Sequence, residues 1–170
     1  MNKVNLLKFV LTAAVSAFAA MCLFADADEA GDEWYAGGAA QILMPQGGSS
    51  VGRLGGAAAR GGRYFGRSFA VECEGAMLEN SATLAARAVW HLNGWREFDM
   101  LFGCERFDPF LSAGAKGLIH DGQVGPFAGI GAFFHLTDYW ALRLDADAML
   151  GLDTEAKMLY TVSLGIQRFF

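Results

Sequence analysis

Hydrophobic and polar residues alternate along most of the chain after residue 33. In the stretch 140–150, for example, Leu142 and Leu144 have one parity, and Arg143 and Asp145 have the other. Successive side chains of a β-strand point to opposite faces, so a period of two predicts strands rather than helices. Turn residues interrupt the alternation, and the pattern predicts eight strands at 33–44, 52–65, 69–79, 82–92, 106–119, 126–136, 139–150 and 157–170.

Each predicted strand has one apolar face and one face of small, polar or charged residues. The polar faces are poor in lysine and glutamate and rich in glycine, alanine and serine, which suits a tightly packed interior better than a solvated surface. Aromatic residues fall at strand ends, where the interfacial girdle of a membrane barrel lies: Trp34, Phe65, Trp90, Phe134, Trp140 and Phe170. Because lipid offers no hydrogen-bond partners to an open sheet edge, we predict an all-β fold, an eight-stranded antiparallel up-and-down transmembrane β-barrel. A soluble sandwich is the alternative, with the apolar faces meeting in a core.

The first 27 residues have a different pattern. Lys3 and Lys8 begin it, an apolar run of 16 residues follows from Phe9 to Phe24, and Ala25 to Ala27 offers a small-x-small cleavage motif. A transmembrane helix needs about 20 apolar residues, so this run fits a signal peptide better. We therefore expect a cleaved signal peptide over 1–27 and an outer-membrane barrel domain over 28–170.

Composition agrees with a single exported domain. The chain has 170 residues, of which 18% are charged, below the about 25% typical of soluble domains. The formal net charge of −5 argues against a nucleic-acid partner, which would require a basic surface.

The predicted inward positions carry eight charged residues, four basic and four acidic: Arg60, Glu72, Glu74, Arg87, Lys116, Arg143, Asp145 and Asp147. An unpaired charge in a filled barrel interior is costly, so equal numbers of the two signs indicate a neutral salt-bridge network. A narrow ion or water path is the second interpretation, and catalytic carboxylates are the third.

The last predicted strand ends on an aromatic residue, and its outward face consists of Tyr160, Val162, Leu164, Ile166 and Phe170. This strand resembles the C-terminal assembly signal of bacterial outer-membrane barrels, although Arg168 stands where an aromatic or apolar residue is usual. The stretches 106–117 and 126–150 resemble strands five to seven of the small eight-stranded outer-membrane barrels, those of the OmpA transmembrane-domain, OmpX and opacity-porin type. The resemblance is strongest over 106–170.

The resemblance implies a monomer in the outer membrane of a diderm bacterium, with both termini in the periplasm. Its implied partners are outer-membrane lipid and the barrel-assembly machinery, which reads the C-terminal strand. In that orientation the connections facing outward are 45–51, 80–81, 120–125 and 151–156, and all are short. Short loops argue against an adhesin-like role, because binding usually resides on loops. The longer periplasmic connection, 93–105, is either one or two amphipathic helical turns or an irregular loop.

Candidate chemistry is sparse. Barrel lipid A deacylases place a histidine and a serine two residues apart on one strand face. In this chain the residue two positions after each histidine is not a serine: Asn93 follows His91, Gly122 follows His120, and Thr137 follows His135. The histidines and cysteines have no metal-ligand spacing, so we expect no metal, no cofactor and no enzyme activity. Whether Cys73 and Cys104 form a disulfide stays open.

The predicted function is therefore a structural, envelope-integrity or narrow porin-like role without catalysis. Two alternatives remain: a soluble periplasmic β-barrel carrier, which would extract without detergent, and a surface-interaction barrel.

Overall fold

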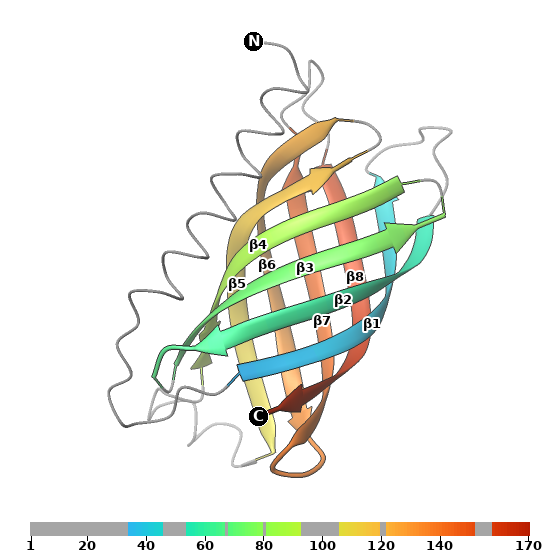
Figure 1. Cartoon of the computed structure of the whole chain (residues 1–170). Coiled ribbons are helices and arrows are strands. Elements are labelled where there is room, and N and C mark those ends of the chain that lie inside the picture. Colours follow the sequence, from blue (N-terminus) through green and yellow to red (C-terminus); the bar gives the residue numbers. More distant parts are fainter. Residues whose placement is uncertain are drawn as a thin grey trace.

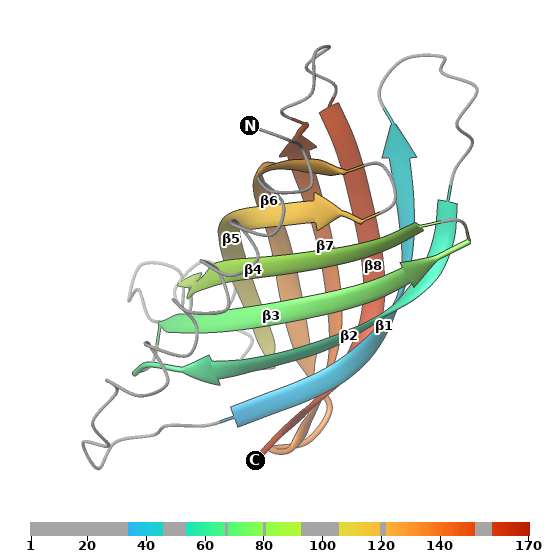
Figure 2. The same ribbon diagram turned by 45° about the horizontal axis from the view of Figure 1, so that its top comes forward.

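The computed structural model of the protein describes residues 34–45, 54–66, 68–79, 81–92, 106–119, 122–151 and 158–170. Eight antiparallel strands close into one barrel in chain order (Figure 1). They are β1 (Trp34–Pro45), β2 (Leu54–Tyr64), β3 (Phe69–Leu78), β4 (Ser81–His91), β5 (Phe107–Leu118), β6 (Gln123–His135), β7 (Trp140–Leu150) and β8 (Met158–Phe169). The last strand pairs with the first, so the ring has no open edge (Figure 2). The predicted fold is confirmed. Within the described ranges, no helix is long and apolar enough to cross a membrane.

Seven of the eight strands lie within two residues of their predicted bounds. The exception is β6, which begins at Gln123 rather than at 126. Gly122, directly before β6, has a φ of +60°, a conformation that glycine adopts readily. Pairing with β5 starts at the next residue, with Leu118 opposite Gln123.

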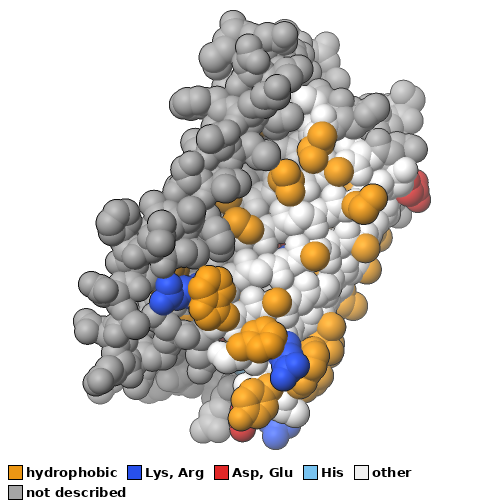
Figure 3. Space-filling view, in the orientation of Figure 1, with side chains coloured by type: hydrophobic (Ala, Val, Ile, Leu, Met, Phe, Trp, Pro, Cys, Tyr) orange, Lys and Arg blue, Asp and Glu red, His pale blue; other side chains and the backbone are white. Residues whose placement is uncertain are grey.

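The predicted outward and inward faces are also confirmed. On β7, Leu142 and Leu144 are 40% and 49% exposed on the outside, while Arg143 and Asp145 are 0% and 2% exposed on the inside. On β8, Leu164 is 58% exposed on the outside. In the soluble-sandwich alternative these apolar faces would meet each other, but here they lie on the outer wall. The side of the wall seen in Figure 3 also carries exposed apolar side chains. An apolar outer wall is the surface that a barrel presents to lipid.

Exposed aromatic side chains, together with the half-buried Phe65, gather at the end of the barrel where β1 begins and β8 ends, which is the lower end in Figure 1. We call this group the aromatic rim: Trp34, Phe65, Trp90, Phe134, Tyr139, Trp140 and Phe170. It includes all six aromatic residues that the sequence places at strand ends. At the opposite end of the described outer wall, Tyr160 is the exposed aromatic side chain. The girdle is therefore one-sided within the described residues.

Several predicted features lie outside the described residues. They are the signal peptide over 1–27, the connection 93–105 with Cys104, and most of the outward connections at 45–51 and 151–156. His120 and Asn93 also lie outside them.

Candidate functional site

The barrel interior contains three layers of buried side chains. The order is visible along β7, whose inward positions are Ala141, Arg143, Asp145, Asp147 and Met149, each at most 4% exposed. The first belongs to an apolar cluster at the lower end, the last to an apolar cluster at the opposite end, and the three charged residues lie between them.

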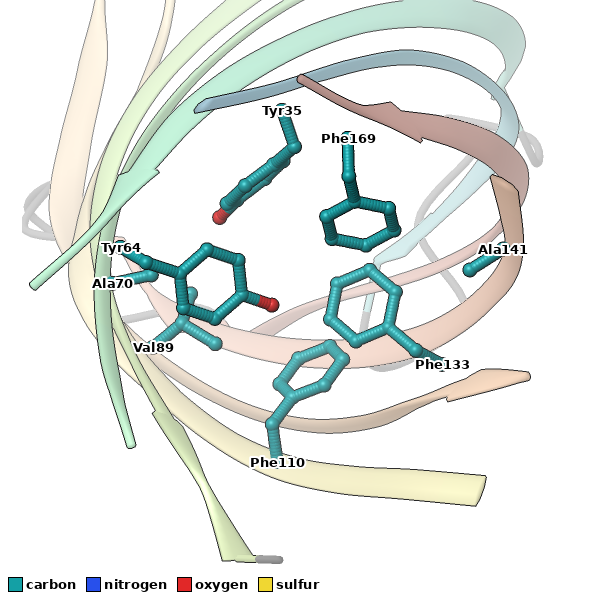
Figure 4. Packing of buried hydrophobic residues seen from close by; sticks show 8 residues of the cluster. All are labelled: Tyr35, Tyr64, Ala70, Val89, Phe110, Phe133, Ala141 and Phe169. Carbon is teal, nitrogen blue, oxygen red and sulfur yellow. The ribbon is translucent and has the colours of Figure 1, made fainter. Parts of the chain in front are cut away.

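The lower apolar layer is mainly aromatic. Figure 4 shows its rings converging on the barrel axis from different strands. Its members are Tyr35, Tyr64, Ala70, Val89, Phe110, Phe133, Ala141 and Phe169. The upper apolar layer is mainly aliphatic and consists of Leu43, Leu78, Ala85, Leu118, Phe127, Met149 and Leu159.

Glycines on neighbouring strands make room for the large rings. Tyr35 lies directly opposite Gly62, and Phe110 lies directly opposite Gly131. A β-carbon on Gly62 would overlap the ring of Tyr35, and a β-carbon on Gly131 would overlap the ring of Phe110. In these two pairs a large residue thus faces a small one, which lets the rings pack inside an eight-stranded barrel.

The middle layer, which we call the charge layer, contains all eight charged residues that the sequence analysis places inside. Each is buried, with at most 6% of its surface exposed. Two ion pairs follow directly from strand register: Arg60 lies opposite Glu74, and Glu72 lies opposite Arg87. The distances are 2.6 Å from Arg60 Nε to Glu74 Oε2 and 3.2 Å from Arg87 Nε to Glu72 Oε1. Oppositely charged residues that face each other across two strands stabilise their pairing.

Other ion pairs cross the interior and tie distant strands together. Asp145 Oδ2 on β7 accepts a hydrogen bond from Arg60 Nη1 on β2 at 2.7 Å. Arg87 Nη1 on β4 lies 3.4 Å from the other carboxylate oxygen, Asp145 Oδ1. Arg143 reaches from β7 to Glu72 on β3 and also contacts Asp145 through Nε at 3.0 Å.

Lys116 completes the charge layer from β5. Its Nζ lies 3.1 Å from Asp147 Oδ2, and Arg87 Nη2 lies 3.5 Å from the same oxygen. All eight predicted residues therefore belong to one connected set of contacts with four positive and four negative members.

Three further polar side chains belong to this network and were not identified from the sequence. The Tyr35 hydroxyl donates to Glu72 Oε2 at 3.0 Å, and Arg60 Nη2 donates to Ser163 Oγ at 2.5 Å. Lys116 Nζ donates to Thr161 Oγ1 at 3.4 Å. The inward parity of Ser163 and Thr161 in the last strand was a usable signal. Strand β1, which contains Tyr35, alternates too weakly to give one.

Aromatic rings cover the charge layer on both sides. The Arg143 guanidinium carbon lies 4.7 Å and 5.1 Å from the ring centroids of Phe110 and Phe133 in the lower layer. The Arg87 guanidinium carbon and Lys116 Nζ each lie 5.1 Å from the ring centroid of Phe127 in the upper layer. Cation–π contacts strengthen when water is excluded, so the apolar layers both close the interior and stabilise its cations.

A partly buried polar pair lies at the level of the lower apolar layer. His91 is 2% exposed, and its Nδ1 lies 2.5 Å from Asp108 Oδ2. Its ring stacks on Phe133 with centroids 5.6 Å apart and lies 4.8 Å from the ring of Tyr64. His91 lies near the end of the predicted strand 82–92, and the sequence analysis assigned it no partner. The pair joins β4 to β5 through side chains, in addition to the strand hydrogen bonds.

The remaining candidate residues do not assemble into a reactive centre within the described part of the chain. His135 lies over Phe169, with ring centroids 5.4 Å apart. Cys73 has outward parity on β3, and Cys104, with which the sequence analysis leaves a disulfide open, is outside the described residues. No group of three or more histidine, cysteine, aspartate or glutamate side chains there has a metal-binding arrangement.

Comparison with known proteins supports the fold. No family model and no curated protein matches the chain. Among solved structures, one match is Ail, the attachment invasion locus protein of Yersinia pestis, in complex with the heparin analogue sucrose octasulfate. Its TM-score is 0.54 and its sequence identity is 13%, over 83% of this chain and 99% of that chain.

Two further solved structures match less closely. Neisserial surface protein A matches with a TM-score of 0.49 and 15% identity, over 80% of this chain and 95% of that chain. The outer membrane enzyme PagL matches with a TM-score of 0.45 and 14% identity, over 77% of this chain and 97% of that chain. At such identities the Ail likeness shows the fold, that of a small transmembrane β-barrel.

Proposed function

We propose that this protein is a structural barrel of the outer membrane, which contributes to envelope integrity and neither conducts nor catalyses. The observation that supports this most strongly is the filled interior. The five inward side chains of β7 run from one apolar layer through the charge layer to the other, and each is at most 4% exposed. A porin-like channel would leave its lumen-facing side chains accessible to water.

The same interior argues against the soluble carrier. A carrier for apolar ligands needs an apolar cavity inside and a polar surface outside. Here the centre holds four cations and four anions, and the outer wall carries exposed Leu144, Ile130 and Leu164. Because burial of charge requires pairing, this arrangement suits a lipid-facing barrel with a packed, neutral core.

The carboxylates of the charge layer also suit a structural role better than a catalytic one. Glu72, Glu74, Asp145 and Asp147 each lie within ion-pair distance of at least one arginine or lysine. They are closed off from solvent by the two apolar layers. A general acid or base needs access to a substrate proton, and these groups have none in the described structure.

We further propose that a signal peptide over 1–27 exports the chain and that the barrel-assembly machinery inserts the monomer through β8. The apolar outer face of β8 and its pairing with β1 support this, since β8 is the strand that closes the ring. The outer-membrane location in a diderm bacterium belongs to the same proposal.

The proposal is tested by fractionation, heat-modifiability and conductance. The full chain is expressed in a diderm host, and outer membranes are run on SDS gels with and without boiling. We expect recovery in the outer membrane, a boiling-dependent mobility shift, and no unitary current steps in planar bilayers. Recovery in the soluble periplasm without a shift would support the carrier, and stable current steps from the shifted form would support the porin-like role.

A further inference from the structure

An arginine lies among the residues of the aromatic rim, on the lipid-facing side of the wall. Arg168 lies near the end of β8, has outward parity and is exposed. It is directly opposite Trp140 on β7 and Ala36 on β1. Its guanidinium carbon lies 5.7 Å from the ring centroid of Trp140 and 5.0 Å from that of Phe170. The guanidinium is therefore in contact with two aromatic rings of the rim.

These contacts orient the guanidinium. An arginine head group is planar and has five N–H donors in its plane, while cation–π contact uses its faces. The two ring contacts thus restrict where this exposed group can lie and leave its N–H donors available to an acceptor. Because the side chain is already positioned, less conformational entropy is lost when an acceptor binds.

The level of the rim identifies the acceptor. Tryptophan and tyrosine gather where the hydrocarbon core meets the head groups, and Trp34, Tyr139 and Trp140 set that level at this end of the barrel. The charge that lies there in a bilayer is the lipid phosphate. We propose that Arg168, held by Trp140 and Phe170, forms a binding site for the phosphate of a phospholipid head group.

Two other arginines at the same end help to define the site. Arg63 also lies over two rim rings, 5.5 Å from Trp34 and 5.5 Å from Phe65, but it is only 8% exposed and so is not accessible to a head group. Arg106 is exposed in the turn before β5, and it has none of the ring contacts that hold Arg168 within the described structure. Arg106 is thus a control of equal charge at the same end of the barrel.

The experiment measures lipid retention by native mass spectrometry on the detergent-purified full chain. The probes are dioleoylphosphatidylglycerol and dioleoylglycerol, which have the same acyl chains with and without a phosphate. We expect the unaltered barrel to retain phosphatidylglycerol over diacylglycerol. Arg168→Gln should retain phosphatidylglycerol about tenfold more weakly, since a charge-assisted hydrogen bond is lost. Arg106→Gln should behave like the unaltered chain.

Additional arms separate the outcomes. Trp140→Leu removes one ring and keeps the charge, and it should give an intermediate loss, so the proposal remains testable if Arg168→Gln does not fold. Equal retention by Arg168→Gln and Arg106→Gln, or equal retention of the two lipids, would overturn the proposal. Displacement of the lipid by millimolar inorganic phosphate would also overturn it, because the ligand would then be a free anion.

This inference rests on the membrane location proposed above, and the two fail in different ways. A barrel without a boiling-dependent mobility shift contradicts the membrane role. A barrel that shows the shift but no phosphate-dependent lipid retention contradicts only the head-group site.

Discussion

Replacing Arg143 with methionine removes the most deeply buried cation of the charge layer. Arg143 is 0% exposed, and its guanidinium forms ion pairs with Glu72 and Asp145. Methionine occupies a similar length without the charge, so the change isolates the electrostatic part of the interaction. It leaves the layer with three positive and four negative side chains.

The expected loss in free energy of unfolding depends on which ion pairs the carboxylates of Glu72 and Asp145 retain. Removing one partner of a buried ion pair typically costs about 3–5 kcal/mol. Glu72 keeps Arg87 at 3.2 Å, and Asp145 keeps Arg60 at 2.7 Å. We therefore expect the free energy of unfolding to fall by about 3 kcal/mol, the lower end of that range.

Arg168→Met is the matched control, because it removes the same charge from an exposed position on the same barrel. An exposed arginine contributes about 0–1 kcal/mol, so this variant should unfold close to the unaltered chain. A second variant, Arg143→Met with Glu72→Gln, restores a neutral charge layer. It should recover part of the loss, with a coupling energy of about 0.5–3 kcal/mol between the two sites.

The assay is urea unfolding of the barrel refolded in detergent micelles. The folded fraction is read from the boiling-sensitive gel mobility and from tryptophan fluorescence. With a denaturant slope of about 1–3 kcal/mol/M, the Arg143→Met midpoint should fall by at least about 1 M. Equal losses for Arg143→Met and Arg168→Met would refute the buried ion-pair layer.

Two further predictions concern the inner and outer faces of the wall. Gly62→Ala places a β-carbon against the ring of Tyr35 and should lower the free energy of unfolding by about 1–3 kcal/mol in the same urea assay. In the control Gly38→Ala the β-carbon makes only ordinary contacts, and the free energy of unfolding should change by no more than about 0.5 kcal/mol. Leu164→Arg puts a charge midway along β8 on the lipid face and should cost about 2–4 kcal/mol in a bilayer, whereas Met77→Arg near the end of β3 should cost about 0–1 kcal/mol. Equal costs within either pair would contradict the assigned faces or depths.

Local pattern was enough to predict the strands and their faces. The alternation of Leu142, Arg143 and Leu144 specifies which side chains share a face, because the period of two is a property of the extended backbone itself. Strand β6 shows the limit of such a pattern, since its start depends on the turn at Gly122 and on pairing with β5.

The sequence predicted which residues belong to the charge layer, but not which of them contact each other. Parity and charge placed all eight members of the charge layer inside the barrel. Parity does not say which carboxylate meets which guanidinium. Asp145 and Arg60 are 85 residues apart in the chain and meet at 2.7 Å because the ring closes and the strands β2 and β7 face each other across the interior.

His91 shows the same division at the lower end. Its sequence position, near a strand end, gave no partner. The pairing of β4 with β5 brings Asp108 to its Nδ1, and β6, on the other side of β5, brings Phe133 onto its ring. The division of the interior into an aromatic layer, a charge layer and an aliphatic layer likewise depends on the relative register of all eight strands. Strand identity is local and can be read along the chain, whereas contacts across the interior exist only once β8 pairs with β1 and the sheet becomes a closed ring.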